Sequence, residues 1–279
     1  MFFKKIEPIQ DRIFVVTGAA RGIGLSTARA LIQRGTKVVI CDVDTVQGQI
    51  SADELGPSAS FYQLDVSNRS MFKAVIDQIE TDVGPVHGLI NNAGILSVGS
   101  ILEQSEAGER KMIDVNLFGT LNGIHAVLPK MQDRRSGTIV NVASLTSKIP
   151  APFGAMYTAT KFAISGLTEA LRQELGESGI HLSIIYPALV NTELTSGIKP
   201  TLFPPPLSSV DVAEAIVQAI QHRKNRAYVP KIGAALGLLP SLLPDKLIVR
   251  IADLTGLTNL FDEVDVSQRS AYRNRIKPS

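Results

Sequence analysis

The sequence predicts an α/β protein built around a doubly wound, parallel, seven-stranded sheet. Between residues 11 and 230, short β-branched runs alternate with longer helical patterns. The apolar runs are continuous, as expected for strands that helices cover on both faces. Strands that alternate with helices favour parallel pairing through crossover connections. No repeat, linker or change of composition interrupts residues 11–230, so this span is predicted to be one domain.

Each element follows from its local pattern. The predicted strands, in chain order, are Arg12–Thr17, Lys37–Asp42, Ser60–Asp65, Gly88–Asn91, Gly137–Val142, His181–Tyr186 and Ala227–Pro230. Predicted crossover helices include Ile23–Arg34, Ser70–Val83, a helix from about Tyr157 to Gly176, and one that begins at Ser208 or Ser209 and runs through Arg223.

Four segments lie outside the regular alternation. Residues 1–10 form an N-terminal segment, and residues 188–207, which include Pro204-Pro205-Pro206, are predicted to form a loop or lid. Residues 231–261 form an apolar C-terminal extension, and residues 262–279 form a polar tail that is predicted to be flexible.

Composition excludes several classes of function. The net charge of +2 is too small for an electrostatic nucleic-acid footprint. The four histidines lie far apart, so no metal site is expected. The single cysteine, Cys41, cannot form an internal disulfide, and the N-terminus lacks the apolar stretch of a secretory signal. We therefore expect a cytoplasmic location.

A glycine-rich turn joins the first predicted strand to the first helix. The run Gly18-Ala19-Ala20-Arg21-Gly22-Ile23-Gly24 has the spacing Gly-x-x-x-Gly-x-Gly. Gly18 allows a tight turn, and the other two glycines let the backbone approach a pyrophosphate. The following helix N-terminus presents free N–H groups to that anion. In this strand–turn–helix context, the pattern predicts dinucleotide binding.

The residue at the end of the second strand bears on the choice of cofactor. Asp42 could accept hydrogen bonds from both hydroxyls of an adenosine ribose, and it would repel a 2′-phosphate. This favours NAD. Arg21, inside the glycine turn, could instead pair with a 2′-phosphate, which leaves an NADP-dependent ketone reductase as an alternative.

A tyrosine and a lysine four residues apart are predicted to share one helix face. Tyr157 and Lys161 have the spacing that places two side chains next to each other on a helix. An ammonium near a phenol would lower the tyrosine pKa from its reference value of about 10 and suit it to proton exchange with an alcohol. Ser144 follows the fifth strand, where its hydroxyl could hydrogen-bond a substrate oxygen.

These motifs together resemble the short-chain dehydrogenase/reductase family. The resemblance covers roughly residues 10–230 and rests on Thr17-Gly18-x-x-x-Gly22-x-Gly24, Asn91-Asn92-Ala93-Gly94, Asn116, Ser144, Tyr157-x-x-x-Lys161 and Pro187. It implies an NAD(P)-binding Rossmann fold and a homodimer or homotetramer formed through the helices that contain Asn116 and Tyr157.

The resemblance also implies residue roles. Tyr157 would be the acid/base, Ser144 would polarise the substrate oxygen, Lys161 would bind the nicotinamide ribose, and Asn116 would help hold a water in a proton relay. The other residues it places near the cofactor are Asp65 and Val66 beside adenine, Asn92, Ala93 and Gly94 near the sheet edge, and Pro187, Val190 and Thr192 near the carboxamide.

One position departs from the family pattern. The family usually has Pro-Gly after the sixth strand, whereas this chain has Pro187-Ala188. The Cβ of Ala188 would disfavour a positive φ and crowd the nicotinamide.

The predicted substrate is an apolar secondary alcohol or ketone. The pocket is expected to form from residues Leu145–Phe153, Pro187–Leu207 and part of the extension after Pro230, and few charged residues occur in these segments. The candidate wall residues are Leu145, Ile149, Pro152, Phe153, Leu194, Ile198, Leu202 and Phe203. The apolar extension could close this pocket, cover a subunit interface or rest on a membrane surface. Packing on the protein itself is favoured because the basic residues near it form only a thin polar face.

A different class of function remains open at this point. The same fold could serve as a non-catalytic nucleotide-sensing module, since a fold does not fix function. Tyr157 and Lys161 are both present, which favours an enzyme.

Overall fold

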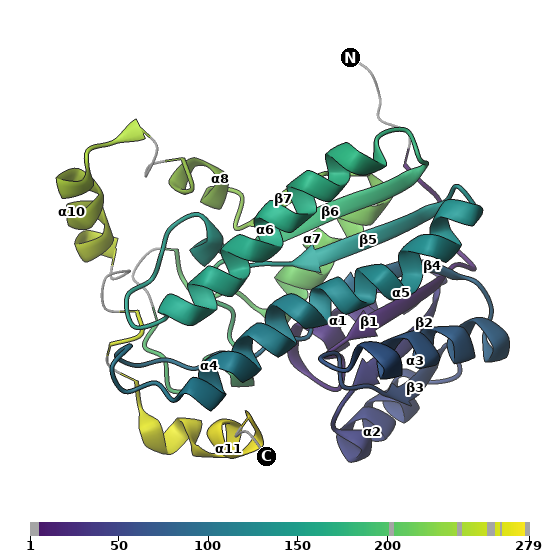
Figure 1. Cartoon of the computed structure of the whole chain (residues 1–279), viewed down its shortest axis with the longest axis horizontal. Coiled ribbons are helices and arrows are strands. Elements are labelled where there is room, and N and C mark those ends of the chain that lie inside the picture. The colour runs from purple at the N-terminus through teal and green to yellow at the C-terminus, as the bar shows by residue number, and fades with distance from the viewer. Residues whose placement is uncertain (1–5, 201–203, 239–241, 256–259, 263, 277–279) are drawn as a thin grey trace.

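A seven-stranded parallel sheet forms the centre of the protein (Figure 1). The computed structural model describes residues 6–200, 204–238, 242–255, 260–262 and 264–276. The strand order is β3-β2-β1-β4-β5-β6-β7, which confirms the predicted doubly wound sheet. The strands are β1 (Ile13–Thr17), β2 (Lys37–Asp42), β3 (Ala59–Gln63), β4 (Val86–Asn91), β5 (Gly137–Val142), β6 (Ile180–Pro187) and β7 (Arg226–Val229).

Helices cover both faces of this sheet, as the continuous apolar strands require. Along β1, Val16 packs into the core layer beneath α1, α2 and α7, whereas Val15 packs into the layer beneath α3, α5 and α6. The helices of the sheet region are α1 (Gly22–Ile32), α2 (Thr45–Leu55), α3 (Arg69–Asp82), α4 (Glu106–Met112), α5 (Gly119–Asp133), α6 (Ala155–Leu175) and α7 (Ser209–Gln221).

Side-chain hydrogen bonds explain where some elements begin and end. The Ser208 hydroxyl accepts a hydrogen bond from Asp211 N, and the Asp211 carboxylate accepts one from Ser208 N, so α7 begins with a capping box. β3 ends at Gln63, two residues earlier than predicted. Just beyond it, Asp65 turns the chain by accepting hydrogen bonds from the backbone N–H and hydroxyl of Ser67.

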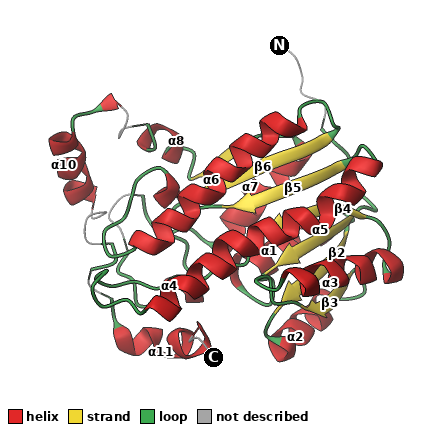
Figure 2. Cartoon of the chain, in the orientation of Figure 1, coloured by secondary structure: helices red, strands yellow, loops and turns green. Residues whose placement is uncertain are grey.

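The carboxyl ends of the strands point toward the side of the molecule that carries α4, α10 and α11 (Figure 2). Because the strands are parallel, the residues that follow them gather at this edge. Three short helical turns also lie near it: the π-helix η1 (Ile113–Phe118) and the 3-10 helices η2 (Leu145–Ser147) and η3 (Glu193–Thr195). The predicted lid contains η3 and a parallel bridge between Val190 and Leu207.

The polar tail contradicts the prediction that it is flexible. Residues Val266–Ile276 form the helix α11, which packs against the body. Tyr272 is only 4% exposed, and Arg269 is 2% exposed. The composition of this segment did not indicate a packed helix because one of the side chains that it buries, Arg269, is charged.

The apolar extension packs on the protein only in part. It contains α8 (Gly233–Leu236) and α10 (Asp245–Thr255). Leu260 and Phe261 are buried, as expected for packing on the protein itself. Leu242 and Leu254 are instead 72% and 79% exposed. Within the described ranges, no helix combines the length and apolar character needed to cross a bilayer. Residues 1–5 of the N-terminal segment lie outside the described residues.

Candidate active site

The glycine turn is packed too closely for side chains at two positions. Gly18 has φ of +62°, and a Cβ placed there would lie 2.7 Å from Ala93 Cα. A Cβ at Gly24 would collide with the carbonyl oxygen of Gly18. α1 begins at Gly22, and the side chain of Arg21 does not cap it. The turn is therefore packed tightly against Ala93 and Asn92, and it leads into a helix N-terminus that Arg21 does not cap, a feature typical of phosphate sites.

Asn92 fastens this turn to the neighbouring strand. Its side-chain amide donates to the carbonyl oxygens of Thr17 (2.9 Å) and Gly18 (3.0 Å). The Thr17 hydroxyl accepts hydrogen bonds from the backbone N–H groups of Asn92 and Ala93, both at 3.1 Å. The structure thus brings the glycine turn and the Asn92–Gly94 segment together.

Carboxylates surround the end of β2. Asp42 accepts hydrogen bonds from Ala20 N at 3.0 Å and from Asp44 N at 3.1 Å. Arg21 forms an ion pair with Asp44 at 2.7 Å and lies 3.7 Å from Glu193. The pKa of Asp44 is lowered, first by the backbone N–H of Gln47 and then by Arg21. Asp44 was missed in the sequence because its contact with Arg21 is made across the turn.

The predicted adenine-side residues lie just beyond β3. Asp65 is exposed, and Val66 is buried. The Val66 carbonyl accepts a hydrogen bond from the Asn122 side chain at 2.9 Å, which ties the segment to α5. Asn122 was not predicted from the sequence, since nothing local indicates a contact across 56 residues.

Tyr157, Lys161 and Ser144 gather where β5 ends and α6 begins. The three side chains are buried, at 8%, 4% and 9% exposed. The Lys161 ammonium lies 5.6 Å from the centre of the Tyr157 ring and donates to Val142 O at 3.0 Å. The Ser144 hydroxyl accepts a hydrogen bond from Thr146 N at 3.2 Å and lies close enough to Tyr157 to lower the pKa of its phenol. The helical spacing and the strand end therefore bring the three predicted groups together.

Asn116 is the fourth member of this group. It is fully buried in η1, where its side chain accepts from Ile95 N at 2.7 Å and donates to Ile95 O at 3.0 Å and to Thr160 Oγ1 at 3.1 Å. A Cβ at Gly94 would lie 3.3 Å from Asn116 Oδ1 and 3.5 Å from Lys161 Nζ. Gly94 therefore lies against both polar groups.

Burial moves the pKa values of this group in opposite directions. It raises the pKa of Tyr157 to about 12, and the hydrogen bond with Ser144 lowers it only in part. It lowers the pKa of Lys161 to about 8. The expected lowering of the Tyr157 pKa is thus not found, because loss of solvation outweighs the favourable contacts of the phenolate. At neutral pH the phenol keeps its proton.

The segment after β6 forms without strain at the unusual alanine. Ala188 donates from its N–H to Val229 O at 2.8 Å, and it is absent from the residues with positive φ. The concern about Ala188 is therefore not borne out for the backbone. The Thr192 side chain would lie 3.6 Å from a Cβ at Gly22, so the predicted carboxamide-side loop lies beside the glycine turn.

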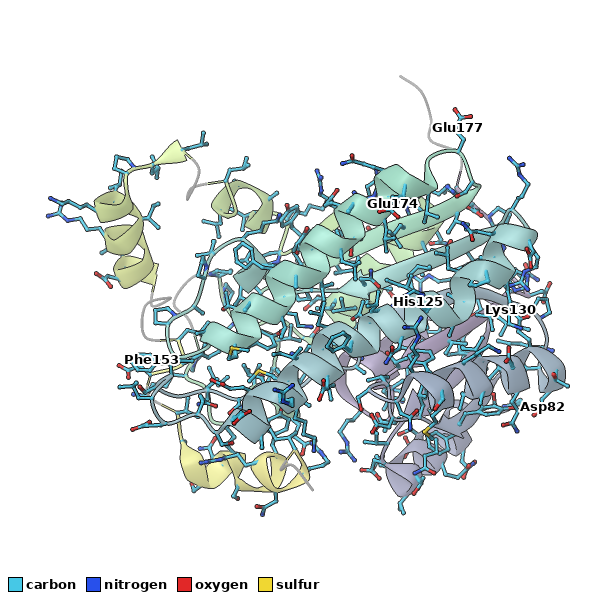
Figure 3. All side chains as sticks on the ribbon, viewed as in Figure 1. Asp82, His125, Lys130, Phe153, Glu174 and Glu177 are labelled. Atoms are coloured by element: carbon cyan, nitrogen blue, oxygen red, sulfur yellow. The ribbon has the colours of Figure 1, made fainter. Side chains whose placement is uncertain are left out.

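A largely apolar pocket opens in front of Tyr157. It holds about 670 Å³ of space, open solvent included. Leu145, Ile149 and Leu194 line it as predicted. Phe153 does not, because it lies at the outside of the loop before α6 (Figure 3) and is 38% exposed. Pro152 is also outside the pocket lining. Ile198 does not line the pocket either, but it packs against the hydrophobic cluster that contains Tyr157 and Phe261. Leu202 and Phe203 lie outside the described residues.

Four further leucine and phenylalanine residues line the pocket: Leu96, Leu189, Leu260 and Phe261. Leu189 lies in the predicted loop 188–207, and Leu260 and Phe261 lie in the apolar extension, so these three belong to the segments expected to form the pocket. Leu96, in the segment after β4, was missed from the sequence. A Cβ at Gly154 would lie 2.6 Å from the Phe261 ring, so Phe261 packs directly on the residue before α6. Among the described residues, no cluster of histidine, cysteine or acidic side chains could hold a metal ion.

Comparison with known proteins places the chain in a family. The short chain dehydrogenase family model matches residues 12–202. A 3-alpha-(or 20-beta)-hydroxysteroid dehydrogenase of Mycobacterium bovis is 38% identical over 192 residues, which cover 69% of this chain and 74% of that protein. The Ketoacyl reductase HetN of Nostoc sp. is 31% identical over 96% of this chain and 95% of its own length.

A solved structure shows the same fold. A short chain dehydrogenase/reductase from Burkholderia phymatum, in complex with NAD, superposes with a TM-score of 0.77 at 28% identity, covering 86% of this chain and 95% of that one. The glycine turn, the buried tyrosine–lysine pair and these matches lead to one conclusion: the chain belongs to the short-chain dehydrogenase/reductase family of oxidoreductases.

Proposed function

We propose that this protein transfers a hydride between NAD(H) and an apolar secondary alcohol or ketone. One observation carries the proposal: Tyr157 and Ser144 are the polar end of a pocket whose other walls are mostly apolar. A substrate oxygen can meet the two hydroxyls while its carbon skeleton contacts the leucines and Phe261. The hydroxysteroid dehydrogenase relatives support this class of substrate.

The residues at the sheet edge fit a dinucleotide. Gly18, Gly22, Ile23 and Gly24 would hold its pyrophosphate, Asp42 its adenosine ribose, and Asp65 with Val66 its adenine. Asn92, Ala93, Gly94, Pro187, Val190 and Thr192 would border the nicotinamide half. The tight packing at Gly24, which leaves no room for a Cβ, holds the turn and the start of α1 in place and so supports such a site. The bound cofactor would supply or accept the hydride.

The protein's own residues would manage the proton. Tyr157, protonated at neutral pH, would donate its phenolic proton to the oxygen of a ketone that is being reduced, and Ser144 would hold that oxygen. Lys161 would bind the nicotinamide ribose and stabilise the phenolate that forms. Asn116, which already joins the Ile95 backbone to Thr160, would help to hold a water in a proton relay.

The charges around β2 support NAD rather than NADP. A 2′-phosphate would meet Asp42, and the nearby guanidinium of Arg21 is already paired with Asp44. Two negative groups in one small site repel each other. The NAD complex of the Burkholderia phymatum relative is consistent with this choice. Comparable kcat/KM values with NADH and NADPH would instead favour the NADP-dependent alternative.

Absorbance of NADH tests the function directly. We expect the purified protein to oxidise NADH with some member of a panel of ketosteroids and aryl ketones, or to reduce NAD with the corresponding alcohols. Reactions without a ketone or alcohol, and reactions with a carboxylic acid in their place, serve as controls. NADH binding without turnover across the panel would favour the nucleotide-sensing alternative. Turnover of sugars or phosphate esters alone would reject the apolar substrate class.

Two exposed phenylalanines support the predicted homo-oligomer. Phe118 in η1 is 46% exposed and Phe162 in α6 is 43% exposed, and these are the segments that contain Asn116 and Tyr157. We propose that a second copy of the chain covers them, because exposed aromatic groups are typical of interfaces. Sedimentation velocity should show a dimer or tetramer that Phe162→Ser weakens. A monomeric unmodified protein would contradict this. The predicted cytoplasmic location remains part of the proposal.

A further inference from the structure

Arg269 in α11 is a buried cation outside the proposed catalytic group. Only 2% of the residue is exposed. Its guanidinium donates to three backbone carbonyls, at 2.8 Å to Leu194 O, 3.1 Å to Ser196 O and 2.6 Å to Leu96 O. No ion pair to Arg269 occurs among the described residues. A buried charge is costly unless its donors are satisfied, and the planar guanidinium suits several acceptors at once.

The three carbonyls belong to two different walls of the pocket. Leu96 lies in the segment after β4, and Leu194 lies in η3, after β6; both line the pocket with Tyr157. The same two segments carry Gly94 and Thr192, which are proposed to border the nicotinamide. One side chain thus joins two loops that are 98 residues apart in the sequence, as the numbers of Leu96 and Leu194 show.

The rest of α11 supports this connection. Tyr272 lies one turn beyond Arg269, with its ring 4.7 Å from the guanidinium, and its hydroxyl accepts a hydrogen bond from Leu96 N at 2.8 Å. At the start of the helix, Asp265 N donates to Gly197 O at 2.8 Å. Arg275 pairs with Glu193, but both side chains are about one-third exposed, so solvent weakens that contact.

We propose that Arg269 is a positioning residue that sets the width of the substrate pocket by holding the Leu96 and Leu194 walls together. The proposal rests on the proposed function, since it assigns the pocket to an apolar ketone. Arg269 itself is not one of the residues that line the pocket. Its removal leaves three carbonyls without their donors, so the two walls separate and the pocket discriminates less between compact and bulky ketones.

Variants of one helix test the proposal with a matched control. Arg269→Met removes all three hydrogen bonds, Arg269→Lys keeps the charge but loses the planar fork, and Arg273→Met removes an exposed charge from the same helix. Hydrogen exchange is read at the amides of Thr195, Ser196 and Ile198, which donate within the loop. Kinetics with a compact and a bulky ketone, and NADH fluorescence titration, complete the set.

We expect at least about tenfold faster exchange at these amides in Arg269→Met, with a smaller change in Arg269→Lys and none in Arg273→Met. The KM for the compact ketone should rise roughly tenfold while kcat and the NADH Kd stay within about threefold, and the ratio of kcat/KM for compact over bulky ketone should fall.

Unchanged exchange and KM in Arg269→Met would overturn the proposal. So would a loss of protection throughout the sheet together with weakened NADH binding, since that would show a general structural role. If Arg269→Met does not fold, the same measurements on Arg269→Lys decide whether the proposal holds. Failure of both variants to fold also counts against the proposal. If the unmodified protein reduces no ketone, the proposed function fails, while exchange and NADH binding still judge whether Arg269 holds the two loops.

Discussion

The proposed dinucleotide site, at the glycine turn 18–24, and the C-terminal wall of the pocket, which contains Leu260 and Phe261, are built in different ways. Regular backbone forms the first: parallel strands end together, and the missing side chains at Gly18 and Gly24 bring the turn close to its surroundings. Individual side chains form the second, where Phe261 packs on Gly154 and Arg269 bridges two loops. The proposed cofactor site therefore follows from the fold, whereas the proposed substrate site depends on contacts between distant parts of the chain.

Removing the phenolic hydroxyl should have the largest effect and should affect chemistry only. For Tyr157→Phe we expect kcat/KM to fall about 10³-fold, because general acid–base catalysis contributes on that scale. NADH fluorescence titration should give an unchanged Kd. Tyr62→Phe, at the distant β3, is the matched control. Turnover near that of the unmodified protein would remove Tyr157 from the mechanism.

A side chain added in the glycine turn should weaken cofactor binding and leave the substrate pocket unchanged. The Cβ of Gly24→Ala would collide with Gly18 O and lie 2.8 Å from the Asn92 amide nitrogen. We expect NADH affinity to fall roughly 100-fold, since even a small displacement of a positioned group is costly. Gln33→Ala, at the exposed C-terminal end of the same helix α1, is the control. Equal NADH affinity in Gly24→Ala and the control would contradict the assignment of the glycine turn to the cofactor site.

The pH dependence should differ between the two directions. Because burial raises the pKa of Tyr157 to about 12, the phenol needed for ketone reduction is present at pH 6–8, so reduction should vary little there. Alcohol oxidation needs the phenolate, whose fraction rises about tenfold per pH unit below the pKa, so oxidation should increase with pH. Initial rates at saturating cofactor measure both. Oxidation that slows as pH rises from 6 to 8 argues against the assignment.

Changing the acid at β2 should alter the choice of cofactor without touching the pocket. Asp42→Ala removes a negative charge and the acceptor of the Ala20 N–H. We expect the preference for NAD over NADP, as a ratio of kcat/KM, to fall roughly tenfold, in line with the energy of two nearby like charges. Asp53→Ala, in α2, is the control. The substrate KM should stay constant, and an unaltered cofactor ratio would count against Asp42.

The smallest effect should come from trimming the C-terminal wall. Phe261→Ala removes one apolar contact from the pocket, so we expect the KM for an apolar ketone to rise about fivefold, in proportion to the buried area lost. NADH affinity should be unaffected. Leu254→Ala, at an exposed site in α10, is the control. If Phe261→Ala weakens NADH binding as much as ketone binding, the two regions are not independent.

The difference between local patterns and contacts of distant segments also explains which residues the sequence could predict. Tyr157 and Lys161 were predicted because their helical spacing occurs together with the other motifs, and Asn92 was predicted through the family resemblance. Asn122 and Asp44 were not, since their contacts depend on how separate loops meet. α11 was missed because it buries a guanidinium against carbonyls, which no hydrophobic pattern indicates.

Tyr157 and Ser144 are proposed to receive the oxygen of an apolar substrate beside a bound nicotinamide. A crystal structure with NADH and a slowly reacting apolar ketone measures this directly. We expect the ketone oxygen within about 3 Å of both hydroxyl oxygens, with its carbon skeleton against Leu260 and Phe261. A ketone oxygen that faces away from Tyr157, or a nicotinamide bound away from Gly94, would contradict the account.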